Sequence, residues 1–290
     1  TYWSRKGLMI IKNRVLRRMI NRVRWILDSF IWGFIRVFPA FAKKKKARLP
    51  VAIGITTFLN RFDIFFKPLV RKLVFLFPGC RVIVAANGSV LREEQQRYLH
   101  ELREFCDGYA EIELIAYENP VGLSRLWNSI MKQAGEDRVL MLNDDLKLKT
   151  GFGKFLVNSG ILKEEIATIN SSWSHFLLSQ QIFSLAGPFD EELREVGGED
   201  DDYLARLALK GLRPADYRCD TVGRKKKKRR GVPQLNSYGK DMTNEAGGYS
   251  SYNTDYLRRK WEISDDFFEG AVEIPRQRNK YWKLKSNTSN

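Results

Sequence analysis

The sequence predicts an α/β protein built on a doubly wound, mostly parallel sheet. Short apolar runs typical of buried strands alternate with longer segments whose apolar residues recur at helical spacing. Strands joined by helices imply right-handed crossovers and a parallel sheet. Polar or acidic residues directly follow several of the apolar runs, at the strand ends where such sheets bind ligands.

Four strands are predicted in the first half of the chain, and the first two of them are expected to be buried. They are the apolar runs 51–57, 81–86, 112–116 and 138–142. Apolar residues three and four positions apart predict the helices between them, over 62–73, 91–106 and 123–134. Each strand is therefore followed by a helix, as a parallel sheet requires.

The pattern changes after residue 148. Residues 165–172 and 175–185 are predicted as strands without a helix between them, and residues 187–190 as a turn. Four acids at 199–202 then open a predicted helix over 203–210, since acids favour the first turn of a helix.

The positive charge is concentrated before this α/β body. Residues 1–48 carry 14 Lys and Arg against one acid, so 14 − 1 = +13 of the net +16, and the remaining 36 basic and 33 acidic residues give +3. Apolar residues at helical spacing, mixed with arginine and tryptophan, predict a basic amphipathic helical arm over 1–49. We expect residues 1–48 to bind an anionic membrane surface. Packing of this helix on the domain or on a partner subunit is the alternative.

Three further observations concern partners and location. The basic run 224–230 is either a solvated loop or a mobile flap that meets a diphosphate or an anionic lipid-linked acceptor. No nucleic-acid partner is expected, because the folded body carries little excess positive charge. Three widely spaced cysteines predict reduced thiols. We therefore expect a cytoplasmic protein, peripheral on the cytosolic face of a membrane.

Two acidic clusters are the candidate sites. Asp144 and Asp145 follow the strand 138–142, either as a helix cap or solvated turn, or as a site for Mn²⁺ or Mg²⁺, which prefer carboxylate oxygens. Glu199 and Asp200 are either the ordinary first turn of a helix or a place where a carboxylate takes the proton of an acceptor hydroxyl. The two glycines before them indicate a close backbone approach.

In their order and spacing these motifs resemble glycosyltransferase family 2, whose members have the GT-A fold. The resemblance covers residues 50–262. The segments that carry it are 51–57, 86–89, 119–122 with Asn128, 139–145, 187–190 leading to 198–206, and 252–261.

The resemblance implies a domain organisation and an activity. Residues 50–290 would be the GT-A catalytic domain, with a nucleotide-binding half at 50–148, an acceptor half at 149–262 and a C-terminal tail at 263–290. The enzyme would be a metal-dependent hexosyltransferase of polysaccharide biosynthesis. It would move a sugar from a nucleoside diphosphate sugar, with a UDP-sugar as the expected donor, to a hydroxyl of a glycan or lipid-linked glycan, with inversion.

The resemblance also assigns roles to residues. Asp200 would be the catalytic base, Glu199 would hold the acceptor or the donor sugar, and Asp145 would bind Mn²⁺ or Mg²⁺. The residues expected at the donor nucleotide are Thr56, Thr57, Arg61, Asn87, Asn119, Gly122, Asn128 and Asp144. Those expected at the acceptor are Trp173 and Asp201.

Three departures from the family pattern bear on these roles. Asn143 stands where the first acid of the Asp-x-Asp motif is expected, and Ala86 replaces an acid before Asn87. Many members supply a late histidine to the metal, whereas His100 and His175 both precede the acceptor motif. The metal is therefore expected to have few protein ligands or to be dispensable.

Two other classes of protein are alternatives to a glycosyltransferase. A nucleotidyltransferase would want a glycine-rich basic phosphate loop after the first strand, and residues 57–61 lack one. A non-catalytic membrane- or nucleic-acid-binding module would use the basic segments but would have no need of Glu199 and Asp200.

Overall fold

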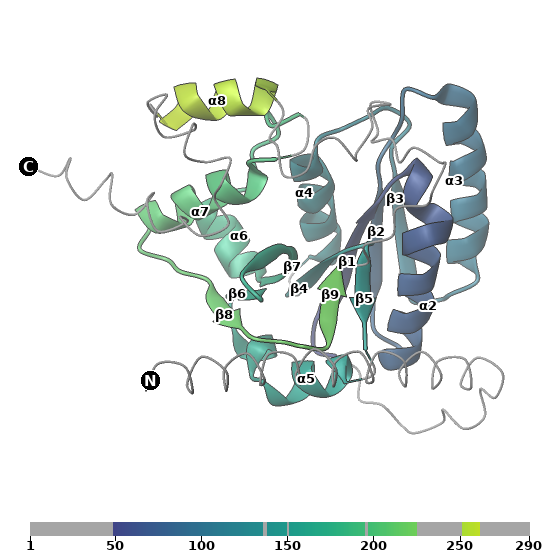
Figure 1. The fold of residues 1–290 in the computed structure, drawn as a ribbon, viewed down its shortest axis with the longest axis horizontal. Coiled ribbons are helices and arrows are strands. Elements are labelled where there is room, and N and C mark those ends of the chain that lie inside the picture. The colour runs from purple at the N-terminus through teal and green to yellow at the C-terminus, as the bar shows by residue number, and fades with distance from the viewer. Residues whose placement is uncertain (1–48, 136–137, 150, 195–196, 225–250, 262–290) are drawn as a thin grey trace, which may run out of the picture.

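A seven-stranded mixed sheet forms the centre of the chain in the computed structural model, which describes residues 49–135, 138–149, 151–194, 197–224 and 251–261. Its strand order is β3-β2-β1-β4-β7-β6-β8 (Figure 1). These strands are β1 (Ala52–Thr57), β2 (Val82–Ala86), β3 (Ile112–Ala116), β4 (Val139–Asn143), β6 (Ile166–Ile169), β7 (Ser172–Leu178) and β8 (Ala215–Tyr217). A second, small sheet pairs β5 (Leu146–Leu148) with β9 (Val222–Arg224).

The pairing directions bring several strand ends together. β1 pairs in parallel with β2 and β4, and β2 pairs in parallel with β3. β6 pairs in parallel with β8, whereas β7 is antiparallel to both β4 and β6. The carboxyl ends of β1, β2, β3 and β4 therefore lie at one edge of the sheet. This confirms the predicted α/β fold with a mostly parallel sheet.

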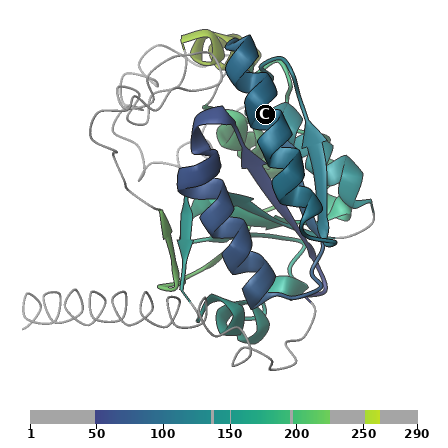
Figure 2. The same cartoon turned by 90° about the vertical axis from the view of Figure 1, so that its right-hand side faces the viewer.

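Helices cover both faces of the sheet. They are α2 (Lys67–Leu76), α3 (Arg92–Asp107), α4 (Leu123–Ala134), α5 (Phe152–Asn158), α6 (Gln180–Ala186), α7 (Glu199–Leu209) and α8 (Ser251–Trp261), with short turns η2 (Leu59–Arg61), η3 (Phe62–Phe66) and η4 (Ile161–Lys163). α2 and α3 lie side by side against one face (Figure 2), and α4, α6 and α7 contribute to the hydrophobic cluster on the other.

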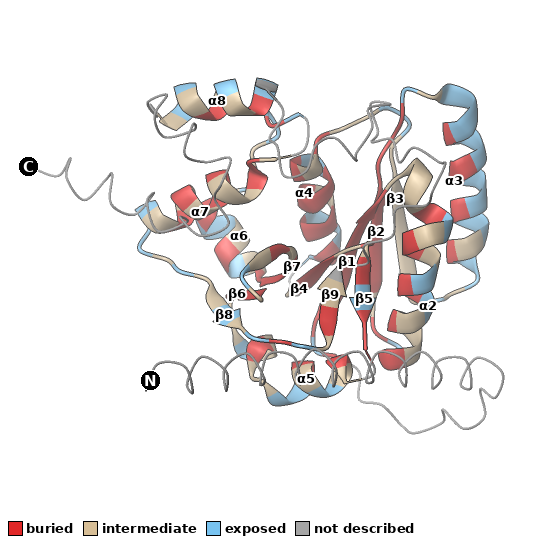
Figure 3. Cartoon of the chain, in the orientation of Figure 1, coloured by how far each residue is buried: buried red, intermediate tan, exposed pale blue. Residues whose placement is uncertain are grey.

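Alternation along the central strands produces the two cores. Ile53 and Ile55 of β1 pack in the cluster that contains α2 and α3, whereas Ala52 packs in the cluster of α4 and α7. Successive side chains of a strand point to opposite faces, so one buried strand supplies both layers. The helices accordingly bury their sheet-facing sides and expose the opposite ones (Figure 3). Burial of two apolar layers is the main force that holds this fold together.

Gly54 sets the spacing between the sheet and α4. A Cβ at this position of β1 would lie 2.6 Å from Ile130 Cγ2 and 2.7 Å from Met141 Sδ. The absence of a side chain lets α4 pack close to the strand. The helix that follows the loop 119–122 is thereby held firmly above the parallel strands.

The predicted helices of the first half are confirmed, with one modification: the segment 62–73 begins as the π-helical turn η3 before α2. The predicted helix 203–210 is confirmed and begins earlier, at Glu199. The strand prediction for 175–185 is wrong beyond Leu178. The hydroxyl of Ser179 accepts a hydrogen bond from the Ile182 amide and caps α6, because serine is a preferred N-cap residue.

Some predictions concern residues outside the described ones. They are the amphipathic arm up to residue 48, most of the basic run 224–230, and the tail 263–290. Among the helices of the described chain, none has the length and apolar character required to cross a bilayer.

Candidate functional site

Polar side chains gather where β1 and β4 end. These strands are parallel neighbours with Thr56 opposite Asn143, so Thr57 and Asp144 emerge side by side. The Thr57 hydroxyl donates a hydrogen bond of 2.8 Å to Asp144 Oδ2. Three residues predicted for the donor nucleotide, Thr56, Thr57 and Asp144, thus share this edge.

Arg61 joins the same group. Arg61 is the last residue of the short turn η2, and its amide donates a hydrogen bond of 2.9 Å to the Phe58 carbonyl. Arg61 Nη2 lies 2.5 Å from Asp144 Oδ1 and 3.5 Å from Asp145 Oδ2. The guanidinium carbon also lies 5.1 Å from the ring centroid of Phe58 and 4.9 Å from that of Phe65. Two carboxylates and two aromatic rings therefore fix this cation.

Burial strongly affects the charges of this group. Burial raises the pKa of Asp144 to about 6, and the nearby Arg61 and the hydrogen bond from Thr57 offset only part of the rise. Burial by itself would lower the pKa of Arg61, but Asp144 and Asp145 more than compensate and raise it above its ordinary value. At neutral pH Arg61 therefore stays cationic and Asp144 is mainly ionised.

The residues at this edge do not fit a divalent metal ion. Mn²⁺ and Mg²⁺ need several oxygen ligands that are free to coordinate. Asp144 and Asp145 both face Arg61, and the described ranges contain no group of three or more His, Cys, Asp or Glu side chains able to hold an ion. A metal at Asp145 would lie next to a guanidinium. The predicted metal ligand is thus an ion-pair partner in this structure.

The end of β2 is tied to the loop before α4. Asn87 Nδ2 donates to the Val121 carbonyl and Asn87 Oδ1 accepts from the Val121 amide, both at 2.9 Å. A Cβ at Gly88 would lie 2.1 Å from the backbone of Asn119. The predicted residues Asn87 and Asn119 are therefore neighbours, with the Asn87 side chain holding the loop. Gln95, which we had not predicted, supports them by donating to the carbonyls of Asn87 and Tyr117 at 3.1 and 3.0 Å.

Gly122 brings this loop against the segment before α7. A Cβ at Gly122 would lie 2.3 Å from the Leu193 carbonyl oxygen. Only a glycine allows so close an approach. The contact joins the first half of the chain to the segment that leads to Glu199.

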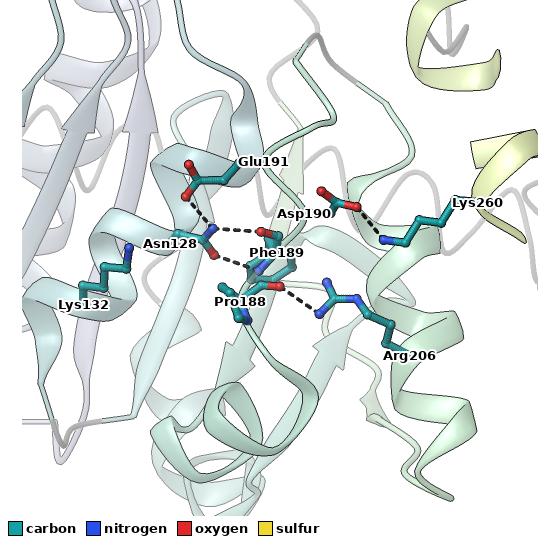
Figure 4. Close-up of a pocket in the computed structure, with 8 residues that line it drawn as sticks. All are labelled: Asn128, Lys132, Pro188, Phe189, Asp190, Glu191, Arg206 and Lys260. Atoms are coloured by element: carbon teal, nitrogen blue, oxygen red, sulfur yellow. Dashed lines mark hydrogen bonds and ion pairs between the residues drawn. The ribbon is translucent and has the colours of Figure 1, made fainter. Parts of the chain in front are cut away.

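Asn128 has a different place from the one predicted. Its Nδ2 donates to the Phe189 carbonyl and to Glu191 Oε1, both at 2.9 Å, and its Oδ1 accepts from the Phe189 amide at 2.8 Å. The side chain is buried and holds the turn 187–190 against α4 (Figure 4). Asn128 therefore positions the turn, and its polar groups are engaged with protein atoms rather than aimed at a nucleotide.

The second acidic cluster begins at two glycines with left-handed backbone angles. Gly197 has φ 112° and Gly198 has φ 94°, which favour glycine, and α7 starts directly after them. The Gly197 amide donates to both carboxylate oxygens of Glu199, at 3.0 and 2.9 Å. Glu199 is 3% exposed, and burial raises its pKa to about 8. Asp200 and Asp201 are half-buried in the same turn.

Asp202, which we had not predicted as a site residue, is the point where α8 meets α7. It is 1% exposed and accepts hydrogen bonds from Arg206 Nε at 2.9 Å and Trp261 Nε1 at 3.0 Å, with Lys260 Nζ at 2.7 Å. Asn253 Nδ2 adds a hydrogen bond of 2.9 Å to the Gly197 carbonyl. α8 therefore covers the acidic turn. The i,i+4 spacing of Asp202 and Arg206 was visible in the sequence, but the partners on α8 were not.

Trp173 lies at the start of β7 and packs against α7. Leu142 of β4 pairs with His175 of β7 in antiparallel register, so β7 begins where β4 ends. Trp173, at this beginning, is 4% exposed, and its ring centroid lies 5.9 Å from that of Tyr203 on α7. The acidic turn of α7 and the carboxyl end of β4 therefore lie near the same edge. Trp173, predicted to bind the acceptor, lies in the core instead, because its ring is enclosed by other aromatic rings.

A cavity of about 370 Å³ lies between α4, the turn 187–190, α7 and α8. It is lined by Asn128, Lys132, Pro188, Phe189, Asp190, Glu191, Arg206 and Lys260 (Figure 4). Lys260 Nζ lies 2.5 Å from Asp190 Oδ2, and Arg206 Nη1 donates to the Pro188 carbonyl at 2.8 Å. The charged groups of the lining thus already serve to join α7, α8 and the turn 187–190.

Comparisons with known proteins give distant structural likenesses. No protein-family model and no curated protein matches the chain. Among solved structures, GalNAc-T7 crystallised with UDP, GalNAc and Mn²⁺ has a TM-score of 0.47 at 12% identity, over 61% of this chain and 44% of that chain. S. aureus TarS 1-349 has a TM-score of 0.43 at 13% identity, over 58% of each chain. HddC from Yersinia pseudotuberculosis has a TM-score of 0.41 at 13% identity, over 58% of this chain and 89% of that chain.

These matches span about half the length of the first two proteins, 44% and 58%. At such scores they carry no residue-level correspondence. The assignment of the fold as a mixed α/β sheet with helices on both faces rests on the strand order and pairing of this chain.

Proposed function

We propose that the chain is a glycosyltransferase that moves a sugar from a nucleoside diphosphate sugar, with a UDP-sugar as the expected donor, to a hydroxyl of a glycan or lipid-linked glycan. The observation that carries this proposal is the placement of two acidic clusters near one edge of the parallel strands. One contains Asp144 with its cation, and the other contains the buried Glu199 and the half-buried Asp200. Ligands of such sheets bind at this edge.

The proposed reaction is a displacement at the anomeric carbon. Asp200 accepts the proton of the acceptor hydroxyl as its oxygen forms the new bond to that carbon. The bond from the carbon to the diphosphate oxygen breaks, and its electron pair leaves with the nucleoside diphosphate, so the configuration inverts. Asp200 suits this role better than Glu199, because Glu199 keeps its proton at neutral pH, as its raised pKa of about 8 implies.

Glu199 and the glycines before it would position the base. The two hydrogen bonds from the Gly197 amide hold the Glu199 side chain back against the turn, and the next residue in α7 is Asp200. Asn253, on α8, holds the Gly197 carbonyl. The base would therefore sit on a turn that is fixed on both sides.

The test combines a donor screen with one substitution. Sugar nucleotides are first ranked by how far they raise the melting temperature of the protein. Asp200→Asn is then compared with wild type for release of nucleoside diphosphate from the best donor. Loss of a general base predicts a rate lower by about 10²- to 10⁴-fold. Asp63→Asn, whose side chain is 73% exposed on η3, is the matched control.

The proposal fails if Asp200→Asn folds normally and reacts at the wild-type rate. A chain that no nucleoside diphosphate or sugar nucleotide stabilises would also contradict it. That second result would favour a non-catalytic binding module.

We further propose that residues 1–48 hold the enzyme on an anionic membrane at its cytosolic face. The support is the net charge of +13 in this segment and its helical apolar spacing. Full-length protein is expected to sediment with vesicles that contain anionic lipid, and to remain in solution with neutral vesicles. Equal sedimentation of the full chain and of a chain lacking residues 1–48 would refute the proposal.

A further inference from the structure

We infer that Arg61, rather than a divalent metal ion, supplies the positive charge that meets the diphosphate of the donor. The inference rests on the proposed function, since it concerns the same edge of the sheet. It departs from the metal dependence expected from the sequence, in which Asp145 was to hold Mn²⁺ or Mg²⁺.

Arg61 already lies beside both Asp144 and Asp145. Its Nη2 lies 2.5 Å from Asp144 Oδ1 and 3.5 Å from Asp145 Oδ2. An ion coordinated by these carboxylates would stand next to the guanidinium. Two cations at such a distance repel each other strongly in a site from which water is largely excluded.

The side chain of Arg61 is firmly held in this position. Its side chain is 11% exposed, and its guanidinium lies over the rings of Phe58 and Phe65. The backbone of η2 fixes its origin directly after β1. To admit a metal, the protein would have to break the ion pair with Asp144 and withdraw a cation from between two aromatic faces.

The net charge of these three side chains determines how a diphosphate can bind. Asp144 and Asp145 together bring two negative charges and Arg61 brings one positive charge. The acids alone would repel a diphosphate, so a cation is required between them and the donor. A guanidinium is well suited to this, because it presents several N–H donors in a planar fork that matches phosphate oxygens.

One N–H group of Arg61, at Nε, makes no hydrogen bond within the described residues. This nitrogen is buried. An unpartnered buried donor on a charged side chain is costly. A phosphate oxygen bound beside the guanidinium would satisfy this donor, and Thr57 would continue to hold Asp144.

The main experiment measures binding of UDP to the full-length protein by titration calorimetry, once in EDTA and once in Mn²⁺. Comparable dissociation constants in the two buffers are expected, within about threefold, a difference of less than 1 kcal/mol. Binding that needs Mn²⁺, or that Mn²⁺ strengthens more than about tenfold, overturns the inference while leaving the proposed function intact. Failure of every nucleoside diphosphate to bind in either buffer removes the proposed function and this inference with it.

A second measurement follows Mn²⁺ itself without nucleotide, through the electron paramagnetic resonance signal of the free ion. Wild type is expected to leave this signal unchanged. Arg61→Gln removes the cation, so it is expected to bind UDP in EDTA about 10- to 100-fold more weakly, the range of a hydrogen bond to a charged group. Stoichiometric uptake of Mn²⁺ by wild type overturns the inference.

Two further variants keep this test decisive. Arg71→Gln removes an exposed arginine of α2 and should behave as wild type in both assays. Arg61→Lys retains the charge, so it should still bind UDP in EDTA even if Arg61→Gln fails to fold.

Discussion

Replacement of Asp202 by alanine removes the carboxylate at which α7 and α8 meet. The side chain has no solvent exposure and lies within hydrogen-bonding distance of Arg206, Lys260 and Trp261. Removal of one partner from a buried ion pair costs about 3–5 kcal/mol. Arg206 keeps its bonds to the carbonyls of the turn before α7, and Lys260 keeps Asp190, so we expect the lower end of this range.

A loss of about 3 kcal/mol in a domain of this size corresponds to a melting temperature lower by about 6–12 °C. Calorimetric unfolding would measure the change, and hydrogen exchange would show faster exchange of the α8 amides. Asp255→Ala is the control, because Asp255 is 62% exposed on the same helix, where substitutions change stability by about 0.5 kcal/mol or less. Equal melting temperatures for the two variants would refute the assignment of Asp202 as the anchor of α8.

Three other substitutions test the site. Glu199 has a pKa raised to about 8 in the folded state, whereas in the unfolded state it ionises near the ordinary glutamate pKa of 4.5. The folded state binds more protons between these two values, so the stability should fall as the pH rises from 4.5 to 8, and chemical denaturation should show a smaller fall for Glu199→Gln. Gly88→Ala would place a Cβ 2.1 Å from the Asn119 backbone, so we expect the free energy of unfolding to fall by about 1–3 kcal/mol. Calorimetry should also show weaker nucleotide binding. If neither the stability nor the binding changes, the close contact between Gly88 and Asn119 is contradicted. Asn128→Ala removes three hydrogen bonds of a buried side chain, so thermal unfolding should show a free energy of unfolding lower by about 2–4 kcal/mol. A change below about 0.5 kcal/mol would disprove the structural role of Asn128.

The parallel half of the fold was predictable from the sequence. Each of its strands is a short apolar run, and the helices between them show regular spacing, as the run 123–134 does for α4. These are local signals, and the nearly continuous apolar composition of β1, β2 and β4 reflects their burial on both faces of the sheet. The grouping of Thr57 and Asp144 followed from the rule that parallel strands end at one edge.

The predictions failed where tertiary contacts decide. Residues 180–185 are as apolar as a strand, and only the cap at Ser179 marks them as a helix. Trp173 and Asn128 have side chains that also suit a binding site, and their burial depends on elements distant in sequence. The ion pair of Arg61 with Asp144 joins the turn after β1 to the residue after β4, which lie 83 positions apart, so no local sequence pattern shows that the predicted metal ligands already pair with a cation.

The docking of α8 has an evolutionary consequence. Asp190 with Lys260 and Asp202 with Trp261 are pairs separated by 70 and 59 positions in the chain. A substitution at one member removes the hydrogen bond that the other member makes, so selection should act on the two together. Among divergent homologues we therefore expect these positions to covary across the intervening segment, however much that segment changes in length. Lineages that lose α8 should lose the acid at position 202 as well.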